Sequence, residues 1–455
     1  MKVFHTISLG ASAVILAASA AFAQQSYSTM PTPVPAFPGN ALQPAGVAPE
    51  LTTPAERPRP DYDRLGMREG AFLLFPTIDL SETYDSNILA SQTGTIDDFY
   101  TTLSPALTIQ SDWARHALAL TANGQFKWYT SHDTENVDNG SILAQGRYDI
   151  ETGSYIAANA GYALQHEDRS SPTGTFGINN LLPKAPIEYS TTTGYLGYVR
   201  DEGRIGVHAD TTITSYSYPN TTTASGTIIP EVDRNRMEYV GSLRLSYEIV
   251  PTLPYQAFVR VIGNERQYNS VDLAQLAATG VSARRNSHGW EVDAGTAVQI
   301  TRLVTGEIYA GYLEQDYQAS SIFPMSSGPA FGGNLVWNIT PLTALKGQFS
   351  QSVAETTLVG ASSSSETNVQ LSVEHEMLRN LLLLGSVAYI RDDYSQAAGT
   401  ASRLDNTYAG SVGARYFLTR TWRLRADVAY SDRSSNVTNG GYNRLIATVG
   451  VQAGF

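Results

Sequence analysis

The chain has 455 residues, a formal net charge of −12 and no cysteine. The negative charge argues against nucleic acid as a partner, and the lack of cysteine removes disulfides, thiolate catalysis and cysteine metal sites. Hydrophobic residues make up 42% of the chain, yet no run of 18 apolar residues follows the N-terminal region, which argues against a bundle of membrane helices.

Residues 1–23 have the pattern of a secretory signal peptide. Lys2 supplies the positive charge, Ile7 to Ala20 form a short apolar stretch, and Ala21-Phe22-Ala23 is a small-x-small cleavage site. We therefore expect the mature protein to begin at Gln24. No cysteine follows the cleavage site, so we do not expect a lipoprotein.

Residues 24–67 are crowded with proline and show neither a strand period nor a helix period. Proline removes backbone donors and restricts φ, so we expect an extended or disordered segment in the periplasm. The simplest interpretation is a linker, and the alternatives are a plug of a pore or a docking arm for a periplasmic partner. The prolines are Pro31, Pro33, Pro35, Pro38, Pro44, Pro49, Pro54, Pro58 and Pro60.

From residue 68 to 455, apolar and polar residues alternate in stretch after stretch. Within 115–129 the even-numbered residues are mostly apolar and the odd-numbered ones mostly polar, and similar patterns recur at 72–84, 236–248 and 422–430. Successive side chains of a strand point to opposite faces. Strands with one apolar and one polar face are typical of membrane-spanning β-barrels.

The connections between these stretches alternate between short turns and long polar loops. We expect short turns at Ser111–Arg115, Glu151–Ser154, Asp201–Gly203, Pro251–Pro254, Thr301–Arg302, Thr340–Pro341, Leu378–Asn380 and Thr419–Thr421. Eight such hairpins plus one strand before and one after them predict an all-β fold. This fold is a single transmembrane antiparallel β-barrel of about 18 strands, with short periplasmic turns and long extracellular loops.

The last strand, Tyr442 to Phe455, follows the same rule. Leu445, Val449 and Ala453 belong to its apolar face, whereas small or polar residues lie between them. A half-buried strand of a soluble β-sandwich is the alternative for this stretch alone. The terminal Phe455 resembles the insertion signal of outer-membrane barrels, so we expect outer-membrane lipid and the barrel-assembly machinery as partners.

Aromatic residues near the expected strand ends predict two interfacial girdles. The candidates beside short turns are Trp113, Tyr255 and Trp422, and those beside long loops are Trp128, Tyr129, Tyr268, Tyr317 and Tyr430.

The stretch from Tyr84 to Tyr129 carries a family pattern: YDSNI (Tyr84–Ile88), then Asp97-Asp98, then LSPALTIQSDWARHALAL (Leu103–Leu120). It resembles a porin-like family of outer-membrane β-barrels whose members often lie beside genes for exopolysaccharide synthesis and export. The resemblance covers about 68–455 and implies a role near polysaccharide secretion, with polysaccharide or periplasmic export partners. Independently, YDSNI favours a strand end and turn, and the acidic pair favours a solvated loop over a divalent-cation site.

We find no catalytic constellation, no HExxH or GxSxG motif and no closely spaced histidine pair, so we expect no enzyme, no metal site and no cofactor. The alternation instead places charged residues inside the barrel, as pore-lining candidates. These are Lys127, Arg147, Arg236, Glu238, Arg244, Glu248, Arg260, Arg266, Glu307, Arg415, Arg423, Arg425 and Asp427.

Two functions are consistent with these patterns. The first is a porin-like channel in the outer membrane of a Gram-negative bacterium, which passes a hydrophilic solute and serves exopolysaccharide export. The alternative is a non-conducting barrel with a structural, assembly or surface-loop binding role, because lumenal charges of both signs are able to pair and close the pore.

Overall fold

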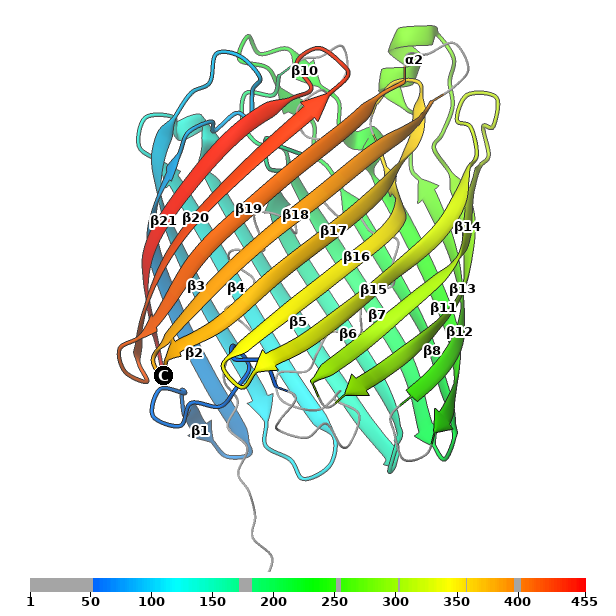
Figure 1. Ribbon diagram of the computed structural model, residues 1–455. Coiled ribbons are helices and arrows are strands. Elements are labelled where there is room, and N and C mark those ends of the chain that lie inside the picture. Colours follow the sequence, from blue (N-terminus) through cyan, green and yellow to red (C-terminus); the bar gives the residue numbers. More distant parts are fainter. Residues whose placement is uncertain (1–51, 172–181, 251–254, 302, 357, 397–401) are drawn as a thin grey trace, which may run out of the picture.

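The computed structural model describes residues 52–171, 182–250, 255–301, 303–356, 358–396 and 402–455, and in this part of the chain one closed antiparallel barrel dominates (Figure 1). Its sheet has nineteen strands, one of which is only three residues long, so eighteen long strands form the barrel. The first long strand pairs with the last, Thr77 opposite Gly454, which closes the sheet. The predicted fold and strand number are confirmed.

The strands are β1 (Met67–Glu69), β2 (Phe72–Asp85), β3 (Asp98–Ser111), β4 (Ala117–Tyr129), β5 (Val137–Glu151), β6 (Ser154–His166), β7 (Glu188–Glu202), β8 (Ile205–Ser217), β9 (Thr221–Thr222), β10 (Ile228–Ile229), β11 (Arg236–Val250), β12 (Tyr255–Tyr268), β13 (Ser287–Thr301), β14 (Val304–Tyr317), β15 (Ser326–Thr340), β16 (Thr343–Glu355), β17 (Ala361–Leu378), β18 (Leu381–Gln396), β19 (Leu404–Phe417), β20 (Trp422–Ser435) and β21 (Tyr442–Gly454). The short helices are η2 (Asp133–Glu135), η4 (Val232–Arg234) and α2 (Leu273–Thr279). None of the described helices has the length and apolar character needed to cross a membrane.

The two ends of the barrel differ in their connections. At the end that we call the short-turn end, neighbouring strands are joined by segments such as 152–153, whereas at the long-loop end the connection 167–187 joins β6 and β7. The strands flanking every predicted short turn are paired, although 251–254 and Arg302 themselves lie outside the described residues. Loops and α2 gather at the top of Figure 1, and the C-terminus lies at the bottom.

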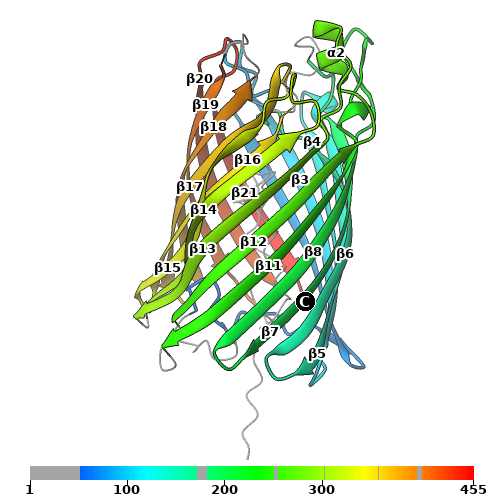
Figure 2. The same cartoon turned by 90° about the vertical axis from the view of Figure 1, so that its right-hand side faces the viewer.

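Alternation separates an apolar outer face from a polar inner face. On β11 the outward side chains Leu243, Leu245 and Tyr247 are 45%, 51% and 48% exposed, whereas the inward Arg236 and Ser246 are buried. An apolar outer surface on a closed barrel is what a membrane-spanning β-barrel presents to lipid. The barrel is broader in Figure 1 than in the perpendicular view of Figure 2, so its cross-section is oval.

The short strand β1 completes the seam of the barrel. It pairs with β2 in the register Met67 opposite Leu74, next to the stretch of β2 that β21 covers. Gly70, in the turn between β1 and β2, has φ of +58°, a conformation that glycine adopts without steric cost. Because β21 ends near Pro76, β1 supplies the partner that this edge of β2 would otherwise lack.

The aromatic girdles were predicted correctly in part. Trp113 and Trp422 at the short-turn end, and Trp128 and Tyr430 at the long-loop end, are 43–50% exposed on the outer face. The assignment was wrong for three tyrosines. Tyr268 and Tyr317 are only 6% and 1% exposed, and Tyr129 shares the inward face of Lys127. These three tyrosines belong to the lumen, because the parity of their positions matches that of inward charged residues.

Candidate functional site: the barrel lumen and its mouths

The interior of the barrel is the candidate site, and its charged side chains meet across several strands. Arg244 on β11 lies 2.8 Å from Glu307 on β14, although two strands separate their own strands in the sheet. Neighbouring strands are about 4.8 Å apart, so long side chains bridge this separation only over the concave inner face. The pore-lining candidates lie on this face by strand parity, and their lining of an open path stays a prediction.

One charged cluster follows the wall from β11 to β14. Arg260 lies 2.6 Å from Asp293 and 3.7 Å from Glu291, next to the Arg244–Glu307 pair. The two guanidinium groups also cover aromatic rings, because Arg244 stands 3.7 Å from the Phe258 ring centroid and Arg260 stands 4.5 Å from that of Tyr309. The cluster therefore holds its charges against the wall as ion pairs and cation–π contacts.

Glu248 lies nearer the short-turn end of β11, on the same face as Arg244. Among the described residues it forms no ion pair.

A second cluster lies where the barrel closes, on β19, β20 and β2. Arg415 is 2.7 Å from Asp427, and Arg425 is 2.8 Å from Asp79 and 3.8 Å from Asp427. The candidate Arg423 belongs to the same strand and the same face, but within the described residues it has no carboxylate partner.

A third cluster crosses the lumen near the long-loop end. Arg266 on β12 pairs with Glu355 on β16, four strands away in the sheet order. The hydroxyls of Tyr268 and Tyr317 donate to the same carboxylate over 2.6 Å and 3.3 Å. This contact ties strands β12 and β16 together over the inner face of the barrel.

The remaining candidates lie toward the ends of strands. Arg236 is 2.7 Å from Glu238 on β11 near the long-loop end. Lys127 stands 4.6 Å from the Tyr100 ring centroid at the same end, and Arg147 is 2.6 Å from Asp149 at the short-turn end. These candidates therefore form separate charged groups near the two ends of the barrel.

Between these groups the inner face is mostly polar and uncharged, with Asp210, which accepts from Ser242 over 2.6 Å, as a charged exception. Asn139 donates to Gln125 over 3.0 Å, and the Ser386 and Ser411 hydroxyls are 2.7 Å apart. Further inward positions by register are Thr102, Ser104, Thr121, Asn123, Ser141, Asn159, Thr193, Thr212, Asn334, Gln348, Ser350, Asn368 and Gln370. Hydroxyl and amide groups therefore dominate the walls between the charged clusters.

At the short-turn mouth, residues 52–66, which we call the N-terminal segment, lie against the inner wall. The backbone amide of Ala55 donates to Glu374 over 3.0 Å, and Arg59 donates to Glu376 over 3.3 Å. The Arg59 guanidinium stands 5.1 Å from the Phe417 ring centroid. Ala55, Phe417 and Leu382 also form a small buried apolar cluster.

Further contacts attach this segment along its length. Lys346 lies 3.6 Å from Glu56, Arg420 donates to the Pro60 carbonyl over 2.7 Å, and Arg64 donates to Gln452 over 2.7 Å. The segment contains no strand or helix, in keeping with its prolines. The range 24–51, where we expected the rest of the Pro-rich region, and the signal range 1–23 lie outside the described residues.

At the long-loop mouth, the loop after β6 reaches β21, five positions away in the closed sheet. Its Asp168 lies 2.9 Å from Arg444 on β21, which also lies 2.6 Å from the fully buried Asp85. Burial would raise the pKa of Asp168, but the charge of Arg444 and hydrogen bonds from Ser170 outweigh burial and hold that pKa well below its ordinary value. The loop is therefore anchored by a charged carboxylate.

Other buried contacts join the neighbouring loops. Arg169 pairs with Glu135 at 2.7 Å, the amide of Leu273 donates to Asp233 over 2.8 Å, and Gly360 donates to Gln275 over 3.1 Å. Burial is the main cause that raises the pKa of Asp233. Together with the ion pair of Arg234 and Glu167, these contacts link loops from β4 through β17 into one layer at this mouth.

The family motif has a structural explanation. Asn87 is fully buried. Its backbone N–H donates to the Asp85 carboxylate over 3.0 Å, and its side-chain Nδ2 donates to the carbonyls of Ser91 and Asn443 over 2.8 Å each. The predicted strand end and turn are confirmed. The sequence interpretation did not include the role of Asp85 as the buried partner of Arg444, which the motif's paired Asp and Asn at a strand end could have indicated.

The expected solvated loop holds for Asp97, which is exposed, but is wrong for Asp98. Asp98 is buried, accepts from the amide of Ser131 over 2.9 Å and lies 2.8 Å from His132 Nδ1, whereas Asp97 accepts from Tyr84. The carboxylate of Asp98 is used to fix the loop between β4 and β5. Among the described residues, no group of three or more His, Cys, Asp or Glu side chains is arranged to hold a metal ion.

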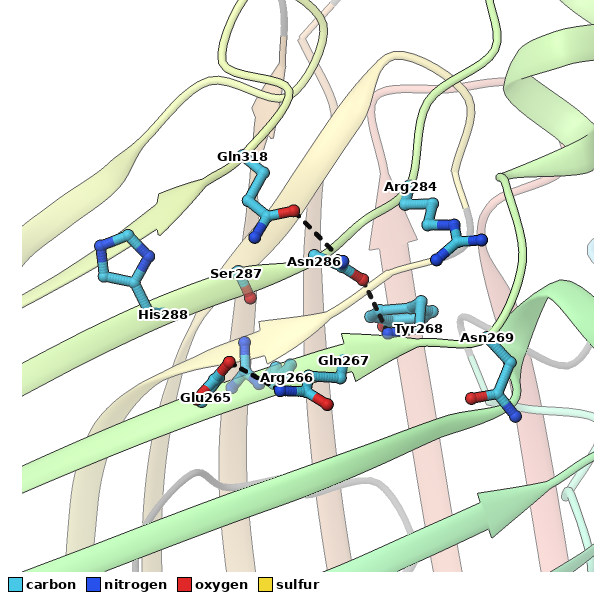
Figure 3. A pocket seen from close by; sticks show the side chains of 10 residues that line it. All are labelled: Glu265, Arg266, Gln267, Tyr268, Asn269, Arg284, Asn286, Ser287, His288 and Gln318. Carbon is cyan, nitrogen blue, oxygen red and sulfur yellow. Dashed lines mark hydrogen bonds between the residues drawn. The ribbon is translucent and has the colours of Figure 1, made fainter.

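A polar cavity of about 450 Å³ opens at the long-loop rim of β12 and β13 (Figure 3). Asn286 lies in its middle, where it accepts from the Tyr268 amide over 2.7 Å and donates to Gln318 over 3.2 Å. Glu265, His288 and Arg284 complete a lining rich in hydrogen-bonding groups. This rim offers a second polar surface outside the lumen.

The chain resembles several known proteins. The sequence model of a family described as "Putative beta-barrel porin 2" matches residues 59–455. A ferric enterobactin receptor mutant of Pseudomonas aeruginosa is 7% identical, with a TM-score of 0.47 over 84% of this chain and 80% of that one. OpdK of Pseudomonas aeruginosa, solved with vanillate, is 10% identical, with a TM-score of 0.42 over 84% and 99%. No curated protein matches the sequence.

Proposed function

The chain belongs to the β-barrel porin family whose sequence model it matches, and from this membership we propose that it is a channel for a hydrophilic solute across an outer membrane. The observation that carries the proposal is the inner face. Its charged side chains are gathered into paired clusters, and hydroxyl and amide groups line the walls between them. A barrel of eighteen strands is wide enough to leave an aqueous interior.

The pairing of charges bears on what the channel would pass. Rings of one charge sign at a constriction select ions, whereas Arg244–Glu307 and Arg260–Asp293 place opposite charges side by side. We therefore expect weak ion selectivity in the middle of the lumen. Side-chain hydroxyls and amides form hydrogen bonds with sugar hydroxyls, which supports a saccharide as the solute.

The resemblance of Tyr84–Tyr129 to barrels encoded beside exopolysaccharide genes supports export of an exopolysaccharide. In this proposal the short-turn end faces the periplasm of a Gram-negative bacterium and the long-loop end faces outward. The solute enters past the N-terminal segment, with periplasmic export partners at that mouth, and leaves through the layer of loops. Outer-membrane lipid surrounds the barrel, which the assembly machinery inserts with the help of Phe455.

The alternative is a non-conducting barrel with a structural or loop-binding role. It is favoured by the contacts that narrow both mouths, namely Arg444–Asp168 at the long-loop end and Arg59–Glu376 at the short-turn end.

Conductance across a planar bilayer separates the two functions. The chain from Gln24 and a variant without residues 24–66 are refolded and compared. Steady conductance of both supports an open channel, and conductance only after the deletion means that residues 24–66 plug the channel. If neither conducts although the barrel is folded, the channel proposal fails and the structural role is favoured.

Ion selectivity then tests the assignment of the inner face with a matched pair of variants. Arg244→Gln leaves Glu307 unpaired and should shift selectivity toward cations, whereas Glu307→Gln should shift it toward anions. Equal selectivity of both variants and the unchanged chain would mean that this pair does not face the conducting path.

A further inference from the structure

One buried guanidinium at the short-turn mouth lacks an acceptor. Arg423 is 8% exposed, and its Nε has no hydrogen-bond partner. Among the described residues it forms no ion pair, and its close contact is the ring of Phe417, whose centroid is 5.1 Å away. A buried N–H group without an acceptor is costly, so the Nε of Arg423 calls for an acceptor at this position.

A small cavity lies directly at this side chain. It measures about 40 Å³ and is lined by Arg415, Arg423, Arg425, Gln452, the carboxylate of Asp79 that pairs with Arg425, and apolar side chains that include Phe417. The Nε of Arg415 also lacks a hydrogen-bond partner. One water needs roughly 10–15 Å³, so the cavity accommodates one small oxyanion group but not a sugar ring.

The N-terminal segment contributes to the same place. Arg64 donates to Gln452, which lines the cavity, over 2.7 Å, and its own Nε has no partner. Arg59 stands 5.1 Å from the same Phe417 ring as Arg423. The cavity therefore lies between the segment and the wall formed by β19, β20 and β21.

The local charge is positive. The arginines in and beside the cavity are Arg59, Arg64, Arg415, Arg423 and Arg425, and the acids are Asp63, Asp79, Asp427 and the Arg59 partner Glu376. Asp79 and Asp427 are already paired with Arg425 and Arg415, and Asp63 accepts from the backbone amide of Arg59. Guanidinium groups match carboxylate and phosphate in a planar, two-bonded geometry.

We propose that this cavity, the Arg423 site, binds the carboxylate or phosphate group of a solute at the short-turn mouth. The inference rests on the proposed channel function for its biological meaning and narrows the solute to one that carries oxyanions, such as an acidic saccharide. The bound group supplies the missing acceptor of Arg423 and bridges the N-terminal segment to the barrel wall.

Isothermal titration calorimetry in detergent tests the site without requiring conduction. The probes are glucuronate, inorganic phosphate and glucose, which separate a sugar carboxylate, a phosphate and a neutral sugar. We expect glucuronate or phosphate to bind and glucose not to bind. Arg423→Gln should weaken binding at least about tenfold, because a hydrogen-bonded charge is lost.

Two further variants make the result decisive. Arg64→Gln should also weaken binding, and it lies outside the long strands of the barrel, so the fold does not depend on it. Arg391→Gln removes an exposed arginine near the opposite end of the barrel and should leave affinity unchanged.

Equal affinity of Arg64→Gln, Arg423→Gln and the unchanged chain overturns the proposal, and so does equal binding of glucose or no binding at all. A barrel that binds the anion yet never conducts would refute the channel but retain the Arg423 site.

Discussion

The attachment of the N-terminal segment should depend strongly on Arg59. Its side chain and that of Glu376 are only 4% and 3% exposed, and they lie 3.3 Å apart. Removal of one partner from a buried ion pair costs about 3–5 kcal/mol. Because Arg57 remains 3.7 Å from the same carboxylate, we expect Arg59→Ala to cost the lower figure, about 3 kcal/mol.

This energy predicts a measurable release of the segment. Every 1.4 kcal/mol changes an equilibrium about tenfold, so the ratio of detached to attached segment should rise about a hundredfold in Arg59→Ala. Trypsin cleavage after Arg64, followed by mass spectrometry, reports this ratio, since cleavage tracks the population of the open form when reclosing is fast. Proline follows Arg57 and Arg59, so these positions do not compete as cleavage sites.

The chain offers a matched control in Arg68. Arg68 lies 2.6 Å from Asp112, but their side chains are 57% and 50% exposed, and exposed pairs contribute about 0–1 kcal/mol. Arg68→Ala should therefore leave cleavage after Arg64 within about fivefold of the unchanged chain. If Arg59→Ala is cleaved no faster than Arg68→Ala, the buried pair does not hold the segment and this reasoning is refuted.

Three other predictions follow from the barrel and its loops. Glu355→Gln leaves Arg266 buried without its carboxylate partner and should lower the free energy of unfolding by about 3 kcal/mol. Urea denaturation in detergent measures this change, and an unchanged midpoint would contradict a stabilising role of the Arg266–Glu355 pair. Val412→Lys, at an outward position that is 64% exposed, should cost about 2–4 kcal/mol in lipid, whereas Ser411→Lys on the inner face should cost clearly less, and equal costs would reverse the face assignment. The pKa of Asp168 is lowered in the folded protein, so the stability from its pair with Arg444 is present above the ordinary Asp pKa of 3.8. This stability is lost only as the pH falls through the lower folded-state pKa. Protection of the loop after β6 against a protease should therefore persist at pH 4, and it should disappear in Asp168→Asn at pH 7.

Local sequence determines which face of each strand a residue occupies. The period of two puts Arg244, Arg425 and Asp427 inside and Leu243, Leu424 and Val428 outside, and the turn pattern yields the number of strands. The partners of Arg425 and Asp427 did not follow from the same pattern, because they depend on how neighbouring strands are staggered once the sheet closes. The misassigned Tyr268 and Tyr317 show the same limit, since tyrosine suits both a girdle and a polar interior.

What the tertiary structure alone decided is which distant residues meet. Arg59 pairs with Glu376, Arg266 with Glu355 and Arg444 with Asp168. Each contact joins a strand, a loop or the N-terminal segment to a wall strand that is not its neighbour in the sheet. Closure brings residues from opposite parts of the chain within a few ångströms according to strand tilt and register. A period of two residues carries no information about that geometry. The face of each charged residue was therefore predictable, but its partners were not. That Arg423 is buried without an ion-pair partner among the described residues was visible only in the folded barrel.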